Sequence, residues 1–259
     1  MTKLQIIVVS STILLFLGMY FGLDTKPKEQ KVIERSREIA AESTDINALL
    51  NDAKSQLSTD KSTLILSIEA KLDEAQSDSA KVDVLKELSG NWYKLERVDI
   101  AGFYAESIAE LKNDEESWSI AGTTYAIGTQ RAKEEKVKKF CFGRSVKAFE
   151  NAISINPSNS THKVNLAVCY AENPLPENPM KGILMLRDLI DKEPENVLVL
   201  TTLGRFAIQT GQYDKAIERL QQATSLEPEN NKANCLLAEA FRGKGDKQQA
   251  ANYATKCNK

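Results

Sequence analysis

The sequence has very few of the residues on which enzyme and metal sites are usually built. His162 is the one histidine in 259 residues, so a metal site or a serine–histidine catalytic pair would depend on it alone. The glycine stretch 122–129, GTTYAIGT, lies on an expected helix and lacks the Gly-Lys-Ser/Thr ending of a phosphate loop. The paired carboxylates Glu115 and Glu116 stand in a charged surface stretch without apolar neighbours to raise a pKa. We therefore expect no catalytic residue, no metal and no cofactor.

Cysteines are also few. The four cysteines are far apart, and none forms a CxxC pair; they are Cys141, Cys169, Cys235 and Cys257. A free cysteine often behaves as a small buried apolar residue, and this interpretation is favoured over a disulfide or a metal set. The absence of a disulfide pattern in turn favours a reducing compartment.

Glycine, proline and aromatic residues are scarce as well. The chain has 12 glycines, 7 prolines and 7% aromatic residues, whereas charged residues make up 27%. This composition suits an all-helical chain better than a β sandwich. The formal net charge of −2 gives no overall attraction to nucleic acid, so nucleic-acid binding is not expected.

The clearest pattern present is the thirty-four-residue stretch from Val197 to Asn230. Apolar, small and turn-forming residues recur through it at fixed positions: Leu200, Leu203, Gly204, Gly211, Tyr213, Ala216, Leu220, Ala223 and Pro228. Gly211 marks a turn between two helices, and Pro228 ends the second helix. The spacing resembles the tetratricopeptide repeat, a helix–turn–helix unit of this length. The resemblance implies that Gly204 and Ala216 face one another where the two helices approach closely.

Weaker copies of the pattern flank this repeat. Pro157, Pro194 and Pro228 close successive units and are spaced thirty-seven and thirty-four residues apart. The resemblance implies an all-α fold in which helix–turn–helix repeats stack into a solenoid over residues 81–259. Residues 26–80 are expected to form a helical stalk before it. An insertion of about eleven residues between the halves of the unit from Trp118 to Pro157 must lengthen its helices or their turn, and the proline-rich stretch 172–179 expands the turn of the next unit.

The N-terminus carries the longest apolar run, from Leu4 to Leu23. Its twenty residues include no charge and match a helix that crosses a hydrocarbon core of about 30 Å. A cleaved signal peptide is the alternative, but its apolar region would be shorter and would precede an A-x-A-like site. We expect a single-span membrane anchor at residues 1–25. The excess of basic residues after the run places the large domain in the cytoplasm; a periplasmic domain is the alternative.

Two further features leave alternatives open. The basic segment 131–147 contains seven Lys or Arg and two acids, and is interpreted as a solvated helix face rather than as a surface for lipid or RNA. The last repeat, from Asn231, is followed by no separate capping helix. Either its final helix is its own cap, or another molecule covers this end, which would allow oligomerisation there.

The resemblance also implies a binding surface, because the first helices of such repeats line a concave groove that often holds an extended peptide. The groove positions here carry Thr161, Val164, Val168, Thr201, Arg205, Gln209, Lys232, Glu239 and Arg242. The family's two-carboxylate clamp does not transfer: Asn165 matches it, but Ser119 and Thr123 replace its Lys and first Asn. Arg205 and Arg242 are candidate anchors for an acidic or carboxylate-bearing partner.

These observations predict a membrane-anchored scaffold, not an enzyme, that holds a protein or peptide partner in its groove. One alternative is an assembly factor for an envelope complex, similar to the anchored repeat proteins of cytochrome c maturation. The other is a protein that tethers RNA at the membrane through its basic segment. The sequence does not identify the partner.

Overall fold

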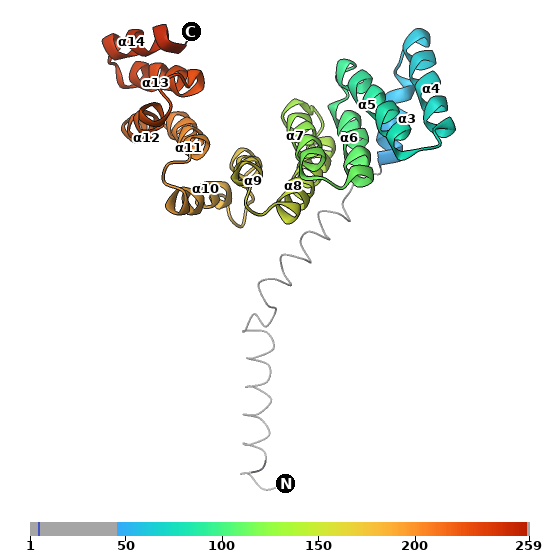
Figure 1. The fold of residues 1–259 in the computed structure, drawn as a ribbon, viewed down its shortest axis with the longest axis horizontal. Coiled ribbons are helices and arrows are strands. Elements are labelled where there is room, and N and C mark those ends of the chain that lie inside the picture. Colours follow the sequence, from blue (N-terminus) through green and yellow to red (C-terminus); the bar gives the residue numbers. More distant parts are fainter. Residues whose placement is uncertain (1–4, 6–45, 258–259) are drawn as a thin grey trace. The chain divides into compact units, whose positions relative to one another are not determined.

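The computed structural model describes residue 5 and residues 46–257, and this part of the chain contains twelve α-helices and no strand (Figure 1). The helices are α3 (Ile46–Ser55), α4 (Thr59–Glu74), α5 (Asp78–Lys94), α6 (Val98–Lys112), α7 (Glu115–Arg131), α8 (Glu135–Ile155), α9 (Ser160–Glu172), α10 (Lys181–Lys192), α11 (Val197–Gln209), α12 (Tyr213–Leu226), α13 (Asn231–Lys244) and α14 (Lys247–Cys257). The predicted all-α fold is confirmed for these residues.

The helices form hairpins that stack along the chain. Within each hairpin the two helices pack closely, as in α5–α6, α7–α8, α11–α12 and α13–α14, and each second helix then packs on the first helix of the next hairpin. The first helices also contact one another in the order α7, α9, α11, α13, whereas direct contacts between second helices are confined mainly to α6 and α8. The first helices therefore form the inner row of the solenoid.

The repeat that begins at Val197 has the predicted hairpin of α11 and α12. Gly211 lies between them with a φ of +71°, a left-handed conformation that costs glycine little. A Cβ atom on Gly204 would lie 2.6 Å from Cγ of Leu220. The close approach predicted at Gly204 is therefore present, but its partner is Leu220, one helical turn beyond Ala216.

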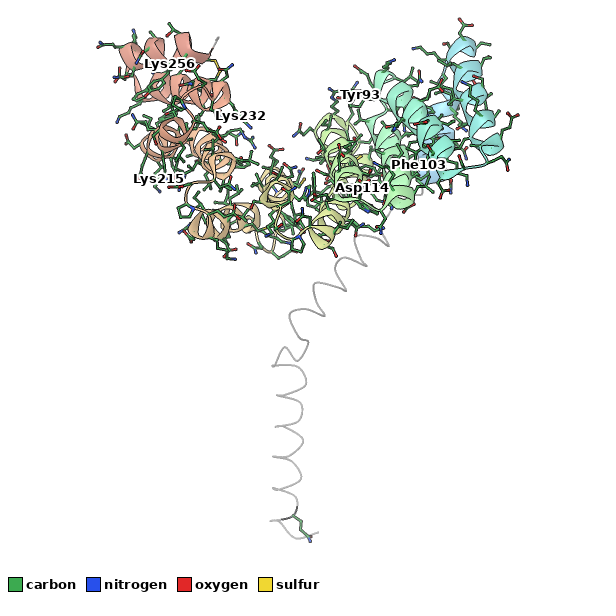
Figure 2. The ribbon with its side chains drawn as sticks, in the orientation of Figure 1. Tyr93, Phe103, Asp114, Lys215, Lys232 and Lys256 are labelled. Atoms are coloured by element: carbon green, nitrogen blue, oxygen red, sulfur yellow. A yellow bond between two sulfur atoms is a disulfide. The ribbon has the colours of Figure 1, made fainter. Side chains whose placement is uncertain are left out.

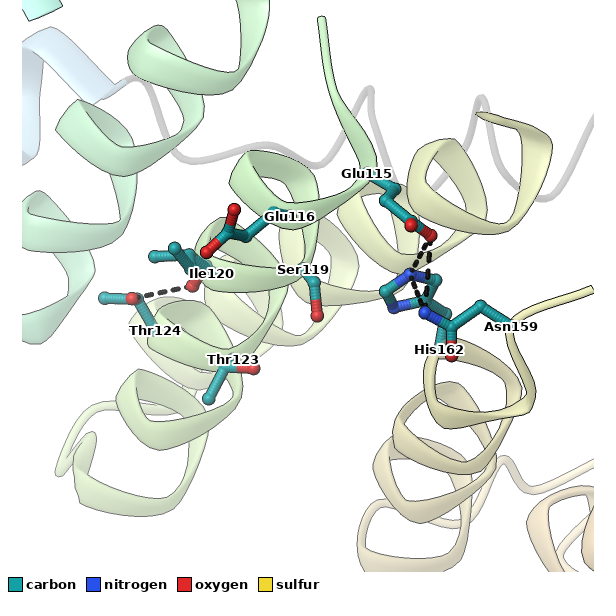
Figure 3. Close-up of a pocket in the computed structure, with 8 residues that line it drawn as sticks. All are labelled: Glu115, Glu116, Ser119, Ile120, Thr123, Thr124, Asn159 and His162. Atoms are coloured by element: carbon teal, nitrogen blue, oxygen red, sulfur yellow. Dashed lines mark hydrogen bonds and ion pairs between the residues drawn. The ribbon is translucent and has the colours of Figure 1, made fainter. Parts of the chain in front are cut away.

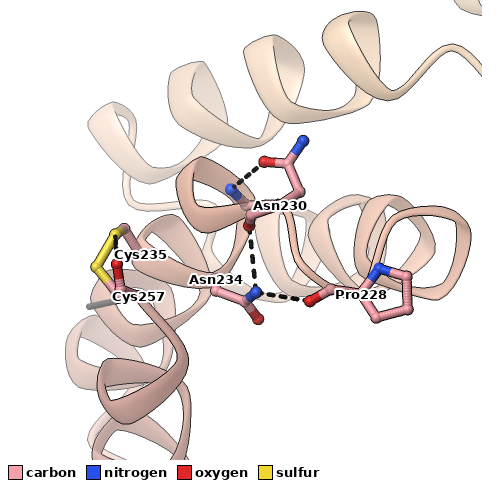
Figure 4. Close-up of a disulfide and its surroundings, with 6 residues drawn as sticks. Pro228, Asn230, Asn234, Cys235 and Cys257 are labelled. Atoms are coloured by element: carbon pink, nitrogen blue, oxygen red, sulfur yellow. Dashed lines mark hydrogen bonds between the residues drawn. A yellow bond between two sulfur atoms is a disulfide. The ribbon is translucent and has the colours of Figure 1, made fainter. Parts of the chain in front are cut away.

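A side-chain cap begins each helix of the inner row. Asn159, Asn196 and Asn230 are the N-caps of α9, α11 and α13, and each side-chain oxygen accepts a hydrogen bond from a backbone N–H in the first turn. Each asparagine follows a proline by two residues, so Pro-x-Asn closes one repeat and opens the next. At the last of these turns, Asn234 Nδ2 also donates to the carbonyl oxygens of Pro228 and Asn230 (Figure 4).

The two insertions lengthen their repeats in different ways. After residue 130, α7 and α8 reach 17 and 21 residues, compared with 13 and 14 for α11 and α12. The proline-rich insertion at 172–179 instead expands the turn between α9 and α10, where Leu175 and Asn178 form an isolated bridge.

Helices α3 and α4 share a core with the repeats. Ala53, Ile65 and Ile68 pack with Leu88 and Trp92 of α5, and residues Thr44–Lys259 form one compact unit. The described part of the predicted 26–80 stalk thus packs against the first hairpin. The boundaries predicted at residues 25 and 80 remain predictions.

The apolar run from Leu4 to Leu23 lies, except for Gln5, outside the described residues. Within the part of the chain that the structure describes, no helix is long and apolar enough to cross a membrane. The membrane anchor therefore stays a prediction.

The cysteines do not all behave as predicted. Cys141 and Cys169 are buried thiols, as expected. The prediction is wrong for Cys235 and Cys257, which form a disulfide between α13 and α14 (Figure 4). The antiparallel hairpin brings the second turn of α13 to the last turn of α14, so the two Cα atoms lie 4.7 Å apart. The two cysteines are 22 residues apart in the sequence, and this spacing alone does not show that they are close in space. Their proximity follows from the antiparallel packing of α13 and α14.

Helix α14 closes the described end of the solenoid. Ala250 is its one buried residue, and Tyr253 stacks on Phe241 of α13 with ring centroids 5.5 Å apart. The outer positions of α14 carry polar and small residues, which include Lys247, Gln248, Gln249, Ala251, Asn252, Thr255 and Lys256. The described end of the solenoid therefore presents a largely polar face, and whether another molecule covers it stays a prediction.

Candidate peptide groove

Two of the predicted groove residues are buried inside the solenoid. Val164 is 1% exposed and packs in one cluster with Val199 and Leu203 of α11. Thr201 is 2% exposed, and its hydroxyl donates to the carbonyl oxygen of Val197. Because contacts between neighbouring first helices cover these positions, neither side chain is available to a partner.

Arg205, a predicted anchor, is already paired. Its Nη1 donates to Oε1 of Glu172 on α9 at 2.9 Å, and its guanidinium lies 4.3 Å from the ring centroid of Phe206. Nε2 of Gln130 on α7 donates to the other oxygen of Glu172 at 2.8 Å. These contacts link α7, α9 and α11 across the inner row, and they compensate the charge of Arg205 within the protein.

The remaining predicted groove residues lie at the surface or at the edge of a cavity. Val168 is half-buried and lines one of the cavities described below. Lys232, labelled in Figure 2, is exposed in the first turn of α13. The other exposed predicted residues are Thr161, Gln209, Glu239 and Arg242.

Two adjoining cavities lie between α7 and α9. The first, of about 340 Å³, is lined by Glu115, Glu116, Ser119, Ile120, Thr123, Thr124, Asn159 and His162 (Figure 3). The second, of about 180 Å³, is lined by Thr123, Ala126, Ile127, Thr129, Gln130, Ser145, Phe149, Asn165, Val168, Cys169, Glu172 and Asn173. Thr123 lines both, so the cavities form one groove, which we call the α7–α9 groove.

The sequence prediction placed the groove on α9, α11 and α13 and missed α7. Glu116, Ser119 and Thr123 occupy on α7 the repeat positions that Thr161, Val164 and Val168 occupy on α9. The signal was present, because Trp118 and Gly122 already set the register of this unit.

A hydrogen-bonded network joins the two helices at one end of the groove. His162 Nε2 lies 2.8 Å from Oε2 of Glu115, and Asn159 Nδ2 donates to the same oxygen at 3.3 Å (Figure 3). Asn156 Nδ2 donates to the other oxygen, Oε1, at 3.0 Å. The hydrogen bonds from Asn156 and then His162 lower the pKa of Glu115, because they stabilise the ionised carboxylate. The network therefore holds a negative charge at this end of the groove.

The groove also contains polar side chains that are free. Within the described residues, Ser119, Thr123 and Asn165 have no side-chain hydrogen bond to another part of the protein. Ile120 is 54% exposed beside them. The groove thus offers hydroxyl and amide groups, together with an apolar side chain, to a bound molecule.

A buried ionic cluster holds α7 against α6 and α8. Glu106 of α6 accepts a hydrogen bond from the Tyr125 hydroxyl at 2.8 Å and pairs with Arg144 of α8 at 3.0 Å. Burial raises the pKa of Tyr125 well above its usual range, so its hydroxyl stays protonated and continues to donate. This cluster fixes the position of α7 between α6 and α8 and takes no part in the groove itself.

Comparison with known proteins finds sequence similarity in the repeats. Residues 181–239 match the model of the family described as "Tetratricopeptide repeat". "Anaphase-promoting complex subunit 3" of Dictyostelium discoideum is 31% identical over 102 residues, which is 38% of this chain. The chain spans 10% of the length of that relative.

Several solved structures are similar to this one. The MamA protein is 17% identical with a TM-score of 0.43, and the match covers 68% of this chain and 89% of MamA. "MamA 41-end from Desulfovibrio magneticus RS-1" is 20% identical with a TM-score of 0.44, covering 71% and 96%. YrrB, described as "a TPR protein with an unusual peptide-binding site", is 14% identical with a TM-score of 0.39, covering 73% and 90%.

The sequence spacing, the stacked hairpins, the Pro-x-Asn turns and the match to the family model agree with one another. The described helices form a helical-repeat solenoid, and its residues 181–239 are assigned to the tetratricopeptide-repeat family by the match to the family model.

Proposed function

We propose that the protein is a scaffold that holds a partner protein by an extended segment of that partner, bound in the α7–α9 groove. The observation that carries the proposal is the pair of adjoining cavities on the inner row, which meet at Thr123. An extended peptide exposes main-chain N–H and C=O groups that need partners when they leave water. The free side chains of Ser119, Thr123 and Asn165 supply such partners along the groove.

We propose that this role is not catalytic. The imidazole of His162 is held by Glu115 and Asn159 in a structural network. Burial raises the pKa of the Cys169 thiol to about 11, and it also raises the pKa of Cys141, so neither thiol is activated as a nucleophile.

We also propose that residues 4–23 anchor the scaffold in a membrane, because twenty uncharged residues favour the hydrocarbon core. The basic-residue count favoured a cytoplasmic domain. The disulfide between Cys235 and Cys257 supports the periplasmic alternative instead, since disulfides persist in oxidising compartments. It therefore favours the second candidate function, an assembly factor for an envelope complex.

The RNA-tether alternative loses support from the contacts of the basic segment. Arg144 and Lys147 both lie close to Glu106, and Lys136 pairs with Glu134. Three of the seven basic side chains are thus partly compensated, which weakens the attraction to phosphates.

Site-specific photo-crosslinking tests the scaffold proposal. A photoreactive amino acid is placed at position 123, in the groove, or at position 187 on α10, where Arg187 is exposed. In cells that make the full-length chain, we expect a defined crosslinked partner from position 123 and not from position 187. Crosslinking from position 187 alone, or from both positions equally, would overturn the assignment of the groove.

A further inference from the structure

The charged side chains that line the α7–α9 groove are all acidic. They are Glu115, Glu116 and Glu172, and no lysine or arginine lines either cavity. Glu172 is compensated by Arg205 at 2.9 Å. At the other end Glu115 pairs with the imidazole of His162, and no lysine or arginine forms a hydrogen bond or ion pair with Glu115 or Glu116 among the described residues. Lys112 attracts Glu116 electrostatically but is bonded to Asp114, so this end of the groove stays acidic.

The two glutamates differ in what they can still bind. Both oxygens of Glu115 already accept hydrogen bonds from Asn156, Asn159 or His162, so this residue contributes chiefly its charge. Glu116 is exposed and has no hydrogen bond or ion pair within the described residues. The neighbouring Lys112 forms its ion pair with Asp114 at 2.8 Å and acts on Glu116 only through the field of its charge. Glu116 is therefore the carboxylate free to contact a ligand.

An apolar side chain lies next to this free carboxylate. Ile120 is one helical turn after Glu116, lines the same cavity and is 54% exposed (Figure 3). Lysine and arginine combine an apolar stem with a cationic end, and they commonly lay the stem along apolar surface while the charge reaches a polar group. The arrangement of Ile120 and Glu116 matches this shape and charge.

We infer that the α7–α9 groove selects a peptide segment with an arginine or lysine side chain at the Glu115–Glu116 end. The stem of that side chain lies along Ile120, and its cation pairs with Glu116 in the field of Glu115. This inference rests on the proposed peptide-binding function and specifies its ligand. The inferred ligand is basic, whereas the sequence predicted an acidic or carboxylate-bearing one. Arg205 is paired within the protein, and neither Arg205 nor Arg242 lines either of these two cavities.

The test uses the full-length chain in a mild nonionic detergent and blocked seven-residue peptide pools on beads. The central residue is fixed as Arg, Lys, Gln, Leu or Glu, and the other positions are randomised. We expect the Arg and Lys pools to retain about threefold to fivefold more protein than the Gln or Glu pools, the size of one partly exposed ion pair. The preference should weaken as salt is raised.

Variants then locate the selectivity. Glu116→Gln removes the charge and keeps the shape, and Ile120→Ala shortens the contact for the stem. Glu218→Gln on α12 is the matched control, because Glu218 is exposed and lines neither cavity. Both groove variants should reduce the preference for Arg and Lys below about twofold or shift it toward Gln and Leu, whereas the control should retain it.

The outcomes separate this inference from the proposed function. Equal retention of all pools, retention of none above bare beads, a preference for the Glu pool, or a preference unchanged in Glu116→Gln would overturn the inference. If a partner still crosslinks to position 123 in any of these cases, the groove function stands without the charge selectivity. If no partner crosslinks there, the proposed function itself fails.

Discussion

The guanidinium of Arg205 on α11 lies 2.9 Å from the carboxylate of Glu172 on α9, so two neighbouring repeats are joined by an ion pair on the inner face of the solenoid. Both side chains are about a quarter exposed, at 26% and 25%. Arg205, which the sequence predicted to anchor a partner, is thus part of the contact between repeats.

This ion pair predicts that Arg205 and Glu172 are modestly coupled in their effects on the free energy of unfolding. It also predicts that replacing Arg205 causes no large loss of affinity for a partner. Arg205→Ala and Glu172→Gln should each lower the free energy of unfolding slightly. Their double-mutant cycle should show a coupling of about 0.5–1 kcal/mol, because the pair is partly solvated. The measurement is denaturant unfolding of the two single variants and the double variant. Strictly additive effects would mean that the pair does not join the repeats.

The contact between Gly204 and Leu220 predicts a larger effect. Gly204→Ala would put a Cβ atom 2.6 Å from Leu220 Cγ, and the overpacking should destabilise the protein by about 1–3 kcal/mol. Gly90→Ala on α5 is the matched control, since a Cβ atom there meets nothing within 4 Å. The control should be neutral or stabilise by about 0.5–1 kcal/mol, because alanine favours helix over glycine. Thermal or denaturant unfolding measures both; equal effects would contradict the close packing.

The Cys235–Cys257 disulfide predicts a stability that depends on reductant. Reduction should destabilise the C-terminal hairpin by about 3 kcal/mol, as expected for a loop of this length. Helix α14 has little other burial to retain it, so the loss should be concentrated there. Hydrogen exchange of α14 with and without dithiothreitol measures it, and a Cys235→Ser/Cys257→Ser variant should not respond to reductant. Four titratable thiols in the denatured, unreduced protein would contradict the disulfide.

Asp114 is the N-cap of α7, and its carboxylate predicts that the protein loses stability in acid. The side chain of Lys112 and the backbone N–H of Ser117 stabilise the ionised carboxylate of Asp114 and lower its pKa to about 2, from an ordinary value of 3.8. A carboxyl group with a lowered folded-state pKa contributes stability above its unfolded pKa. That contribution is lost as the pH falls from about 4 toward 2. The denaturant midpoint should fall less between pH 6 and pH 3 in Asp114→Asn than in the parent protein. If the pH dependence of the midpoint is unchanged, Asp114 does not contribute to the loss of stability in acid.

The repeat architecture was predictable because its signals are local. Gly211 requires a turn, Pro228 ends a helix, and the spacing of Leu200, Leu203 and Leu220 follows the helical period. These preferences act within one hairpin, so the sequence near each residue contains most of the information. The Pro-x-Asn turns belong to the same class, since each asparagine caps the helix that it begins.

The site was harder to predict because it depends on contacts between repeats. Val164 and Arg205 stand at groove positions, but packing on α11 buries the first, and Glu172 pairs with the second from 33 residues earlier. The disulfide likewise depends on how two helices pair. Such contacts follow from the rotation of each hairpin against the next, which the spacing within one repeat does not determine.

The disulfide between α13 and α14 is also expected to determine the end from which the described solenoid unfolds. In a repeat array each hairpin is held by its neighbours, so unfolding proceeds inward from whichever end frays first. The disulfide should keep α14 from fraying, so we expect unfolding of the described solenoid to begin at α3 and α4. The α7–α9 groove should then unfold before the C-terminal repeats under oxidising conditions, whereas reduction should also allow unfolding to begin at α14.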